Sequence, residues 1–252
     1  MNKDADPVTP LLELRNVSKR FGGLRAVREV SFTMGAGEIV FVIGPNGAGK
    51  TTVFNLVSGF FHPDEGSILF QGKDVSKLAP HLSARLGIGR TFQIVKPLAN
   101  LTVLQNVMLG AFMHTGSTQT AEAEATKVLA FLQMSHLKDF SASGLPLAAL
   151  KRLEIARALA TKPKLILLDE VVSGLTTNEA LALAELIKRL PEWGVSVVGG
   201  VEHVMQVVMK IADRVIVLDH GAKIAEGIPS EVVKNPEVIE AYLGAKYKEL
   251  VG

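Results

Sequence analysis

One continuous stretch of sequence decides the fold: Glu38-Ile-Val-Phe-Val-Ile43, then Gly44-Pro-Asn-Gly-Ala-Gly49-Lys50-Thr51-Thr52, then Val53-Phe-Asn-Leu-Val57. The first piece is a short apolar run rich in β-branched residues, which is typical of a buried strand, and the last piece has a helical pattern. The glycines between them let the backbone wrap closely, so that successive N–H groups and the helix N-terminus point at an anion. The stretch therefore predicts a strand, an anion-binding loop and a helix.

The loop matches the phosphate-binding pattern G-x-x-x-x-G-K-[ST] in the strand and helix context that this pattern requires. In this pattern the lysine bridges the β and γ phosphates of a nucleotide, and the Ser or Thr hydroxyl binds Mg²⁺. The alternative, a Gly-rich turn without a ligand before a helix, is disfavoured because both the residue pattern and the flanking strand and helix match a phosphate-binding loop. The predicted nucleotide-binding residues are Gly44, Pro45, Asn46, Gly47, Ala48, Gly49, Lys50, Thr51 and Thr52.

Other apolar runs alternate with helical patterns, which is the signature of an α/β fold with a largely parallel sheet. Core strands are expected at residues 38–43, 164–168, 195–198 and 214–218. The more alternating runs at residues 11–17, 30–34 and 67–71 predict an antiparallel sheet packed beside the parallel one.

Between about residues 95 and 160 the pattern becomes helical, at 103–112, 121–134 and 149–160, which predicts a helical subdomain inserted into the α/β core. Residues 115–124, rich in Thr, Ala and Gly, are the expected mobile linker. We expect one domain over residues 11–246, with residues 1–10 and 247–252 as terminal tails.

Composition narrows the possible functions. The 252 residues are 48% hydrophobic and 21% charged, close to the average of globular chains, which argues against wholesale disorder. A net charge of +2 gives little electrostatic footprint for nucleic acid, so no nucleic-acid partner is expected. The chain has no cysteine, which excludes a thiolate metal site, and no apolar run approaches the 20 or so residues of a membrane span.

A second candidate site, which is acidic, follows another apolar run. Asp169 and Glu170 come directly after Leu165-Ile-Leu-Leu168. Ligands of parallel sheets sit beyond the carboxyl ends of the strands, so these acids are expected near the phosphate loop. We expect Asp169 to hold Mg²⁺ through water and Glu170 to polarise the water that attacks the γ phosphate. A strand ending in Asp-Glu is on its own more often only a solvated strand end.

With these motifs in order, the chain resembles the ATP-binding subunit of an ABC transporter over nearly its full length. Phe21 of Phe21-Gly-Gly-Leu-Arg-Ala-Val resembles the aromatic residue that stacks on adenine. Gln93 of Gly89-Arg-Thr-Phe-Gln93 resembles the glutamine that senses the γ phosphate or Mg²⁺, and His203 of Val201-Glu-His203 resembles the switch histidine. The resemblance implies that Lys50, Gln93, Glu170 and His203 are catalytic and that Thr51, Gln93 and Asp169 bind the metal.

The resemblance also implies a P-loop NTPase (RecA-like) core, with ATP and Mg²⁺ as cofactors, at the cytoplasmic face of a membrane. Expected partners are integral-membrane permease subunits, a second ABC ATPase subunit or a second copy of this chain and, indirectly, a solute-binding protein. Residues 20–32, 89–107 and 236–244 are especially similar to importers of branched-chain amino acids, and related importers of urea or short amides share much of this pattern.

The chain departs from the family at the signature loop, usually Leu-Ser-Gly-Gly-Gln. The aligned residues are Leu145, Pro146, Leu147, Ala148 and Ala149, so the serine and both glycines are missing. Pro146 has neither N–H nor hydroxyl to offer the γ phosphate held by an opposing subunit, and Leu147 adds bulk. Smaller departures are Val171 in place of proline and Thr176 in place of Asp or Asn.

The altered loop leaves alternatives open. The chain could pair with a different ATPase that keeps its signature loop, which would give one active and one weak composite site. Alternatively, the helix dipole and backbone contacts could be enough to bind the γ phosphate despite the substitutions. A second class of function is an ATP-dependent dimerising module with little hydrolysis of its own. A soluble ABC protein acting on ribosomes or DNA usually has two ATPase units or a long coiled coil, and this chain has neither.

Overall fold

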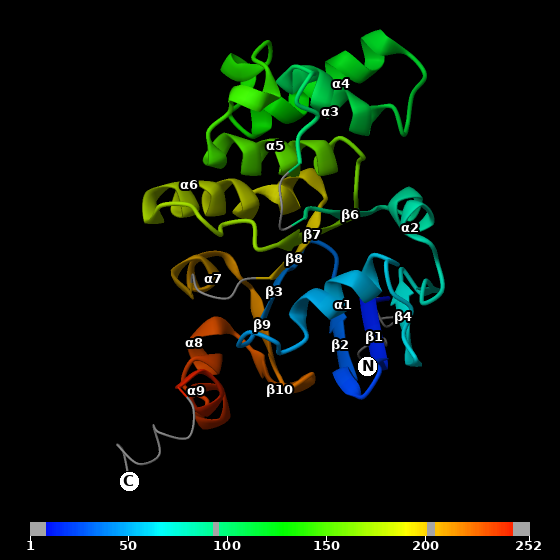
Figure 1. Cartoon of the computed structure of the whole chain (residues 1–252), viewed down its shortest axis with the longest axis vertical. Coiled ribbons are helices and arrows are strands. Elements are labelled where there is room, and N and C mark those ends of the chain that lie inside the picture. The colour runs from blue at the N-terminus through cyan, green and yellow to red at the C-terminus, as the bar shows by residue number, and fades with distance from the viewer. Residues whose placement is uncertain (1–8, 93–95, 201–204, 244–252) are drawn as a thin grey trace, which may run out of the picture.

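The computed structural model describes residues 9–92, 96–200 and 205–243 of the chain. Within these residues the strands form a four-stranded sheet and a six-stranded sheet (Figure 1). The four-stranded sheet has the order β2 (Leu24–Met34), β1 (Leu12–Phe21), β4 (Glu65–Phe70) and β5 (Lys73–Asp74). The six-stranded sheet has the order β10 (Ala222–Gly227), β9 (Arg214–Asp219), β3 (Ile39–Ile43), β8 (Ser196–Gly200), β7 (Leu165–Asp169) and β6 (Ile88–Arg90).

The first sheet is antiparallel throughout, whereas the second is parallel except for β10, which pairs antiparallel with β9. The predicted parallel core and N-terminal antiparallel sheet are thereby confirmed. The sequence patterns did not predict the two-residue strand β5, the short edge strand β6 or the last strand β10.

The helices surround these sheets. They are α1 (Lys50–Val57), α2 (Pro80–Leu86), α3 (Val103–Ala111), α4 (Thr118–Phe131), α5 (Leu147–Leu159), α6 (Thr177–Lys188), α7 (Met205–Ile211), α8 (Pro229–Val232) and α9 (Pro236–Leu243). In Figure 1 the helices α3, α4 and α5 form a layer at the top, α6 and α7 lie along one side of the parallel sheet, and α1 lies beside β1 and β2.

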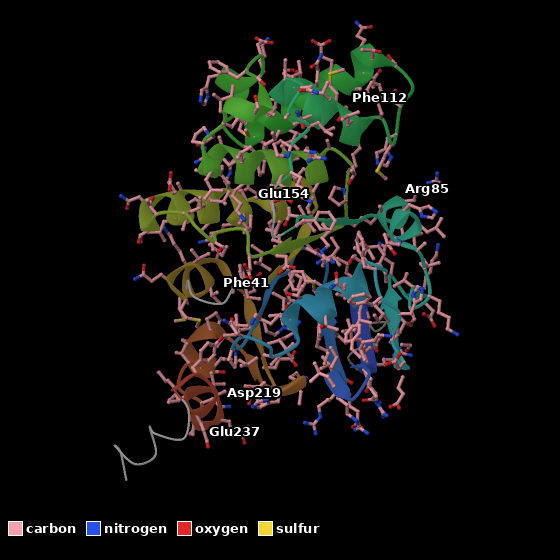
Figure 2. All side chains as sticks on the ribbon, viewed as in Figure 1. Phe41, Arg85, Phe112, Glu154, Asp219 and Glu237 are labelled. Atoms are coloured by element: carbon pink, nitrogen blue, oxygen red, sulfur yellow. The ribbon has the colours of Figure 1, made fainter. Side chains whose placement is uncertain are left out.

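The central strand β3 shows why an uninterrupted apolar run forms the middle of this fold. Ile39, Phe41 and Ile43 point into one buried cluster, which includes residues of α3 to α7. Val40 and Val42 point into a second cluster, shared with α1 and the antiparallel sheet. Because side chains of a strand alternate between faces, a strand covered on both sides must be apolar at every position. Figure 2 shows Phe41 in the middle of the molecule.

The expected linker at residues 115–124 is mostly helix, so that expectation was wrong. The helix α4 begins at Thr118, and the Ser117 side chain caps it by accepting a hydrogen bond from the Thr120 N–H. Ala121 and Ala125 are fully buried against the neighbouring helices. A cap followed by small buried residues lets the helix start earlier than its composition indicated.

Among the described residues, none of the helices combines the length and the apolar character needed to cross a membrane.

Candidate functional site

The phosphate loop joins β3 to α1, and its glycines are required by close backbone approach. Gly49 has a φ of +102° and precedes the first residue of α1. A Cβ atom at Gly49 would lie 2.3 Å from the carbonyl oxygen of Ala26, and one at Gly44 would lie 2.1 Å from that of Leu218. Both distances are far below van der Waals contact, so only glycine allows the loop to nest between β2 and the end of β9.

Lys50 is buried, and its ammonium group lies inside the loop. It donates hydrogen bonds of 2.8 Å to the Gly44 carbonyl oxygen and 2.9 Å to the Pro45 carbonyl oxygen. A buried ammonium group held by carbonyl oxygens, at the N-terminus of a helix, is placed to meet the negative charge of a phosphate.

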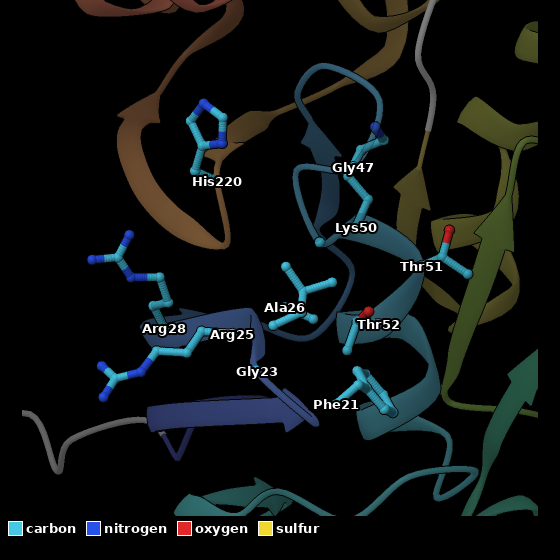
Figure 3. A pocket seen from close by; sticks show the side chains of 12 residues that line it. Phe21, Gly23, Arg25, Ala26, Arg28, Gly47, Lys50, Thr51, Thr52 and His220 are labelled. Carbon is cyan, nitrogen blue, oxygen red and sulfur yellow. The ribbon is translucent and has the colours of Figure 1, made fainter.

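A cavity of about 600 Å³ extends from this loop to Phe21 (Figure 3). Phe21 is 42% exposed, and its ring contacts Phe61 edge to face with centroids 5.1 Å apart. The cavity brings together several predicted residues, namely Phe21, Gly47, Gly49, Lys50, Thr51 and Thr52. Arg25, Arg28 and His220 also line it and were not predicted. Figure 3 shows Lys50 near Gly47, and Thr51 on the side of α1 that faces away from Arg25 and Arg28.

Asp169 ends β7 inside the protein. Its carboxylate, 6% exposed, accepts a hydrogen bond of 3.2 Å from Arg90, whose side chain is 8% exposed. Burial raises the pKa of Asp169, and the Arg90 guanidinium opposes this rise. Thr51 and Asp169 line one cavity of about 480 Å³, which is distinct from the cavity that contains Phe21.

Glu170 has a strained backbone. Its φ is +48°, in the left-handed region that costs a residue with a side chain about 1–3 kcal/mol. Three hydrogen bonds hold it there: its N–H donates to the Gly200 carbonyl oxygen at 2.9 Å, and its own carbonyl oxygen accepts from Ser173 and Lys151. These contacts fix the backbone from which the Glu170 side chain projects.

The altered signature segment leads into α5. Pro146 is the N-cap residue of this helix and, with Leu147, is exposed, whereas Leu145 and Ala149 are buried in the hydrophobic core. Thr176 has a local role as the N-cap of α6, where it forms a capping box with Glu179. That cap explains how Thr replaces the usual Asp or Asn, since all three are good N-caps.

Two predicted catalytic residues, Gln93 and His203, lie outside the described residues.

Three buried charged residues were missed by the sequence patterns: Arg90, Lys151 and Glu154. The Glu154 carboxylate accepts a hydrogen bond of 2.6 Å from the Phe92 N–H, and burial raises its pKa. Lys151 and Glu154 are three residues apart in α5 and lie among buried apolar residues of the same helix, Leu153, Ile155 and Ala156. Charges within an apolar helical stretch were the available signal, because such residues are rarely buried unless they have a partner.

A groove of about 460 Å³ lies between the α/β core and the helical layer. It takes its walls from α2, β6, α3 and α5 and from the loops that follow α1 and β6. Its larger apolar lining residues are Phe60, Pro80, Ile88, Phe92, Leu109 and Met113. Phe60 and Phe92 are half exposed, and their rings contact each other edge to face with centroids 5.7 Å apart.

The site fits Mg²⁺ and a nucleotide chemically. Within the described residues no cluster of three His, Cys, Asp or Glu side chains could hold a metal alone. Mg²⁺, however, is commonly held by one or two protein oxygens together with substrate phosphates. The Thr51 hydroxyl and the Asp169 carboxylate supply oxygens to one cavity beside the glycine cradle.

Comparison with known proteins agrees with this geometry. A family model described as ABC transporter matches residues 27–173, and one described as branched-chain amino acid ATP-binding cassette transporter matches residues 222–248. The chain is 40% identical to a probable branched-chain amino acid transport ATP-binding protein LivG of Archaeoglobus fulgidus, covering 95% of this chain and 98% of the relative. With LivG of Escherichia coli, a high-affinity branched-chain amino acid transport ATP-binding protein, the identity is 39% and the coverage 93% and 98%.

Solved structures show the same fold. A nucleotide-free ATP-binding cassette of an ABC transporter matches with a TM-score of 0.84 and 33% identity, covering 93% of this chain and 99% of that one. An ADP-bound cassette matches with a TM-score of 0.85 and 33% identity over the same shares. A phosphate loop on a parallel sheet, acids at the end of β7 and full-length similarity to these proteins lead to one conclusion: the chain belongs to the ABC transporter family, as an ATP-binding cassette with ATPase activity.

Proposed function

We propose that this chain is the nucleotide-binding subunit that hydrolyses Mg·ATP to energise a multi-subunit ABC importer of branched-chain amino acids. The observation that carries the proposal is that Thr51 of the phosphate loop and Asp169 at the end of β7 line one cavity, with Lys50 buried in the loop beside it. A phosphate chain and a divalent cation need these groups together.

Each residue then has a task. Lys50 and the backbone N–H groups of residues 46–52 bind the phosphates, and Phe21 stacks on the base. Thr51 and Asp169 hold Mg²⁺, which neutralises phosphate charge when it is bound. Glu170, held by its left-handed backbone, orients and polarises the attacking water. From their resemblance to the family motifs, we assign Gln93 and His203 to the γ phosphate and Gln93 also to the metal.

The apolar groove is the surface on which we expect a membrane partner to dock. Phe60 and Phe92 line it, and Phe92 directly precedes in sequence the glutamine that the family resemblance assigns to the γ phosphate, so a short permease helix seated there would be coupled to the nucleotide through this segment. A cassette of this kind works at the cytoplasmic face of the membrane, peripherally, and meets the solute-binding protein only through the permease.

The solute assignment rests on the names of the relatives. The proteins from Archaeoglobus fulgidus and Escherichia coli carry branched-chain amino acid transport in their names, and a family model of the same description matches residues 222–248. An importer of urea or short amides is the competing assignment. A transport assay with labelled leucine and labelled urea distinguishes the two.

For the assembly, we propose pairing with a second ATPase subunit whose signature loop is intact. A solved cassette with a TM-score of 0.77 and 26% identity, covering 86% of this chain and 98% of that one, is a dimer with bound ADP and phosphate. In such a dimer, Pro146 and Leu147 would face the partner's nucleotide and weaken that one site. Restoring Ser-Gly-Gly at positions 146–148 should then raise the ATPase rate of the heterodimer. Unchanged ATPase and transport rates remove the idea.

One observation favours a second candidate function, a module that dimerises on ATP with little hydrolysis. Pro146 at the N-cap of α5 lacks both groups with which a signature serine contacts phosphate. ATP-driven dimerisation with negligible turnover, even beside the partner ATPase, would favour this candidate.

The main test isolates the tagged chain from detergent-solubilised native membranes and identifies the co-purifying proteins by mass spectrometry. The complex is then reconstituted in liposomes and assayed for ATP-dependent leucine uptake. Multi-span permeases, a second ATPase and uptake that a Lys50→Ala variant abolishes are the expected results. Recovery of the chain alone, in conditions that preserve complexes, contradicts the transporter role.

A further inference from the structure

Arg90 joins three parts of the core through one guanidinium group. Its Nη1 atom donates to the Asn55 Oδ1 atom at 2.7 Å and to the Ser58 hydroxyl at 2.9 Å, both at the end of α1. Its Nη2 atom donates to the Asp169 Oδ2 atom at 3.2 Å. Because the side chain is 8% exposed, these contacts take place almost out of solvent. Arg90 therefore contacts the carboxylate to which we assign Mg²⁺.

The same guanidinium also reaches the groove. Its carbon atom lies 5.5 Å from the ring centroid of Phe60 and 5.3 Å from that of Phe92, within the range of cation–π attraction. Arg90 lines both the groove and the cavity that contains Thr51 and Asp169. Phe92, Glu154 and Arg157 line both spaces as well, so Arg90 is one of four residues at the boundary between them.

The hydrogen bonds of Arg90 are incomplete. Its Nε–H group is buried and has no hydrogen-bond partner among the described residues. A buried donor without an acceptor destabilises its arrangement, so the guanidinium gains by any movement that gives Nε an acceptor. The guanidinium can keep its contacts with Asn55 and Ser58, or with the rings of Phe60 and Phe92, during such a movement.

We propose that Arg90 is a displaceable counter-ion of Asp169: it pairs with the carboxylate while the cation site is free and turns toward the Phe60–Phe92 groove when Mg²⁺ and nucleotide bind. The inference rests on the proposed function, because it takes Asp169 as a metal ligand. It adds a positioning residue that links the metal site to the groove.

Electrostatics gives the direction of the coupling. A guanidinium and a divalent cation at one carboxylate repel each other, and this repulsion is strong because Asp169 and Arg90 are both buried. Arg90 at Asp169 therefore weakens Mg²⁺ binding, and Mg²⁺ in turn favours release of Arg90. Since such coupling is reciprocal, a hydrogen-bond acceptor that a partner places in the groove, within reach of Arg90, tightens Mg²⁺ binding.

The first experiment uses the unmodified protein. Arginine side chains are labelled with phenylglyoxal in the presence of the non-hydrolysable analogue AMP-PNP, with either EDTA or Mg²⁺, and labelling is quantified by mass spectrometry. We expect labelling of Arg90 to rise at least threefold with Mg²⁺, while that of the exposed Arg85 on α2 stays constant. Unchanged Arg90 labelling, with Mg²⁺-dependent nucleotide binding verified by fluorescence, overturns this inference alone. Failure of the protein to bind nucleotide contradicts the proposed function itself.

The second experiment measures the Mg²⁺ concentration that half-saturates binding of a fluorescent AMP-PNP analogue. Arg90→Met should lower it at least fivefold, because Asp169 loses its competing charge. Arg90→Lys keeps the charge and should stay within twofold of the wild type, and Arg85→Met is the matched surface control. A role in packing alone would shift both Arg90 variants equally, and that result would overturn the inference.

Discussion

Lys151 on α5 donates a hydrogen bond of 3.2 Å to the carbonyl oxygen of Glu170. The lysine is 3% exposed, and Glu170 has the left-handed φ of +48°. A buried charge therefore ties the helix that follows the altered signature segment to the residue that we assign to water activation. Because α5 belongs to the helical layer and Glu170 follows β7, the contact joins the helical layer to the α/β core.

Lys151→Met should remove this tie. We expect kcat for ATP hydrolysis to fall about tenfold, the size of about 1.4 kcal/mol of lost transition-state stabilisation, with little change in KM. Thermal unfolding should show a loss of about 1.5–3 kcal/mol, typical of a hydrogen bond to a charged group. Lys151→Arg should recover part of kcat, and the exposed Lys188→Met is the control. Full activity in Lys151→Met would separate α5 from the chemistry.

Glu170→Gln should lower the ATPase rate about 10²–10⁴-fold, because an amide does not accept the proton of the attacking water. Binding of ATP should persist, since the amide keeps the size of the side chain. The measurement is phosphate release alongside equilibrium binding of a fluorescent ATP analogue, with the exposed Glu185→Gln as control. A rate that stays near wild type would reassign the base to another residue.

Gly49→Ala should abolish nucleotide binding. The φ of +102° is unfavourable for alanine, and the added Cβ would lie 2.3 Å from the Ala26 carbonyl oxygen, so the loop has to move. We expect a thermal destabilisation of about 1–3 kcal/mol together with the loss of binding. Gly116→Ala is the matched control, because nothing lies within 4 Å of its Cβ position. Normal binding by Gly49→Ala would mean that the loop tolerates a different conformation.

Glu154 gives a prediction for pH dependence. Burial raises its pKa in the folded protein, so in the window that begins near the ordinary glutamate value of about 4.3 the folded state binds more protons than the unfolded state. The stability contributed by this group therefore falls as the pH rises through that window. Glu154→Gln keeps an acceptor for the Phe92 N–H and removes the titration.

The measurement for Glu154 is the melting temperature of both proteins at pH 5 and pH 8. The difference, variant minus wild type, should be more positive at pH 8. Glu192→Gln, at an exposed glutamate, is the control. A difference that is the same at both pH values, or larger at pH 5, would show that burial does not govern this carboxyl group.

Local patterns predicted much of the fold. The apolar run of β3, the glycine loop and the helix α1 follow each other within one short stretch, so a single window contains all the information. The core strands β7, β8 and β9 were also found, because strands covered on both faces are apolar at every position. Edge strand β6 was missed because it has only three residues, with glycine in the middle, and pairs with a single neighbour.

The sequence by itself determined the phosphate loop, the acids at the end of β7 and the family. These features depend on residues close together in the chain, or on motifs whose order suffices. Only the tertiary structure decided that Arg90 meets Asn55, Ser58 and Asp169, which lie 35, 32 and 79 residues away along the chain. It alone decided that Lys151 and Glu154 are buried. The physical reason is that a charge inside a protein is stabilised by partners that folding brings together, and no local pattern records them.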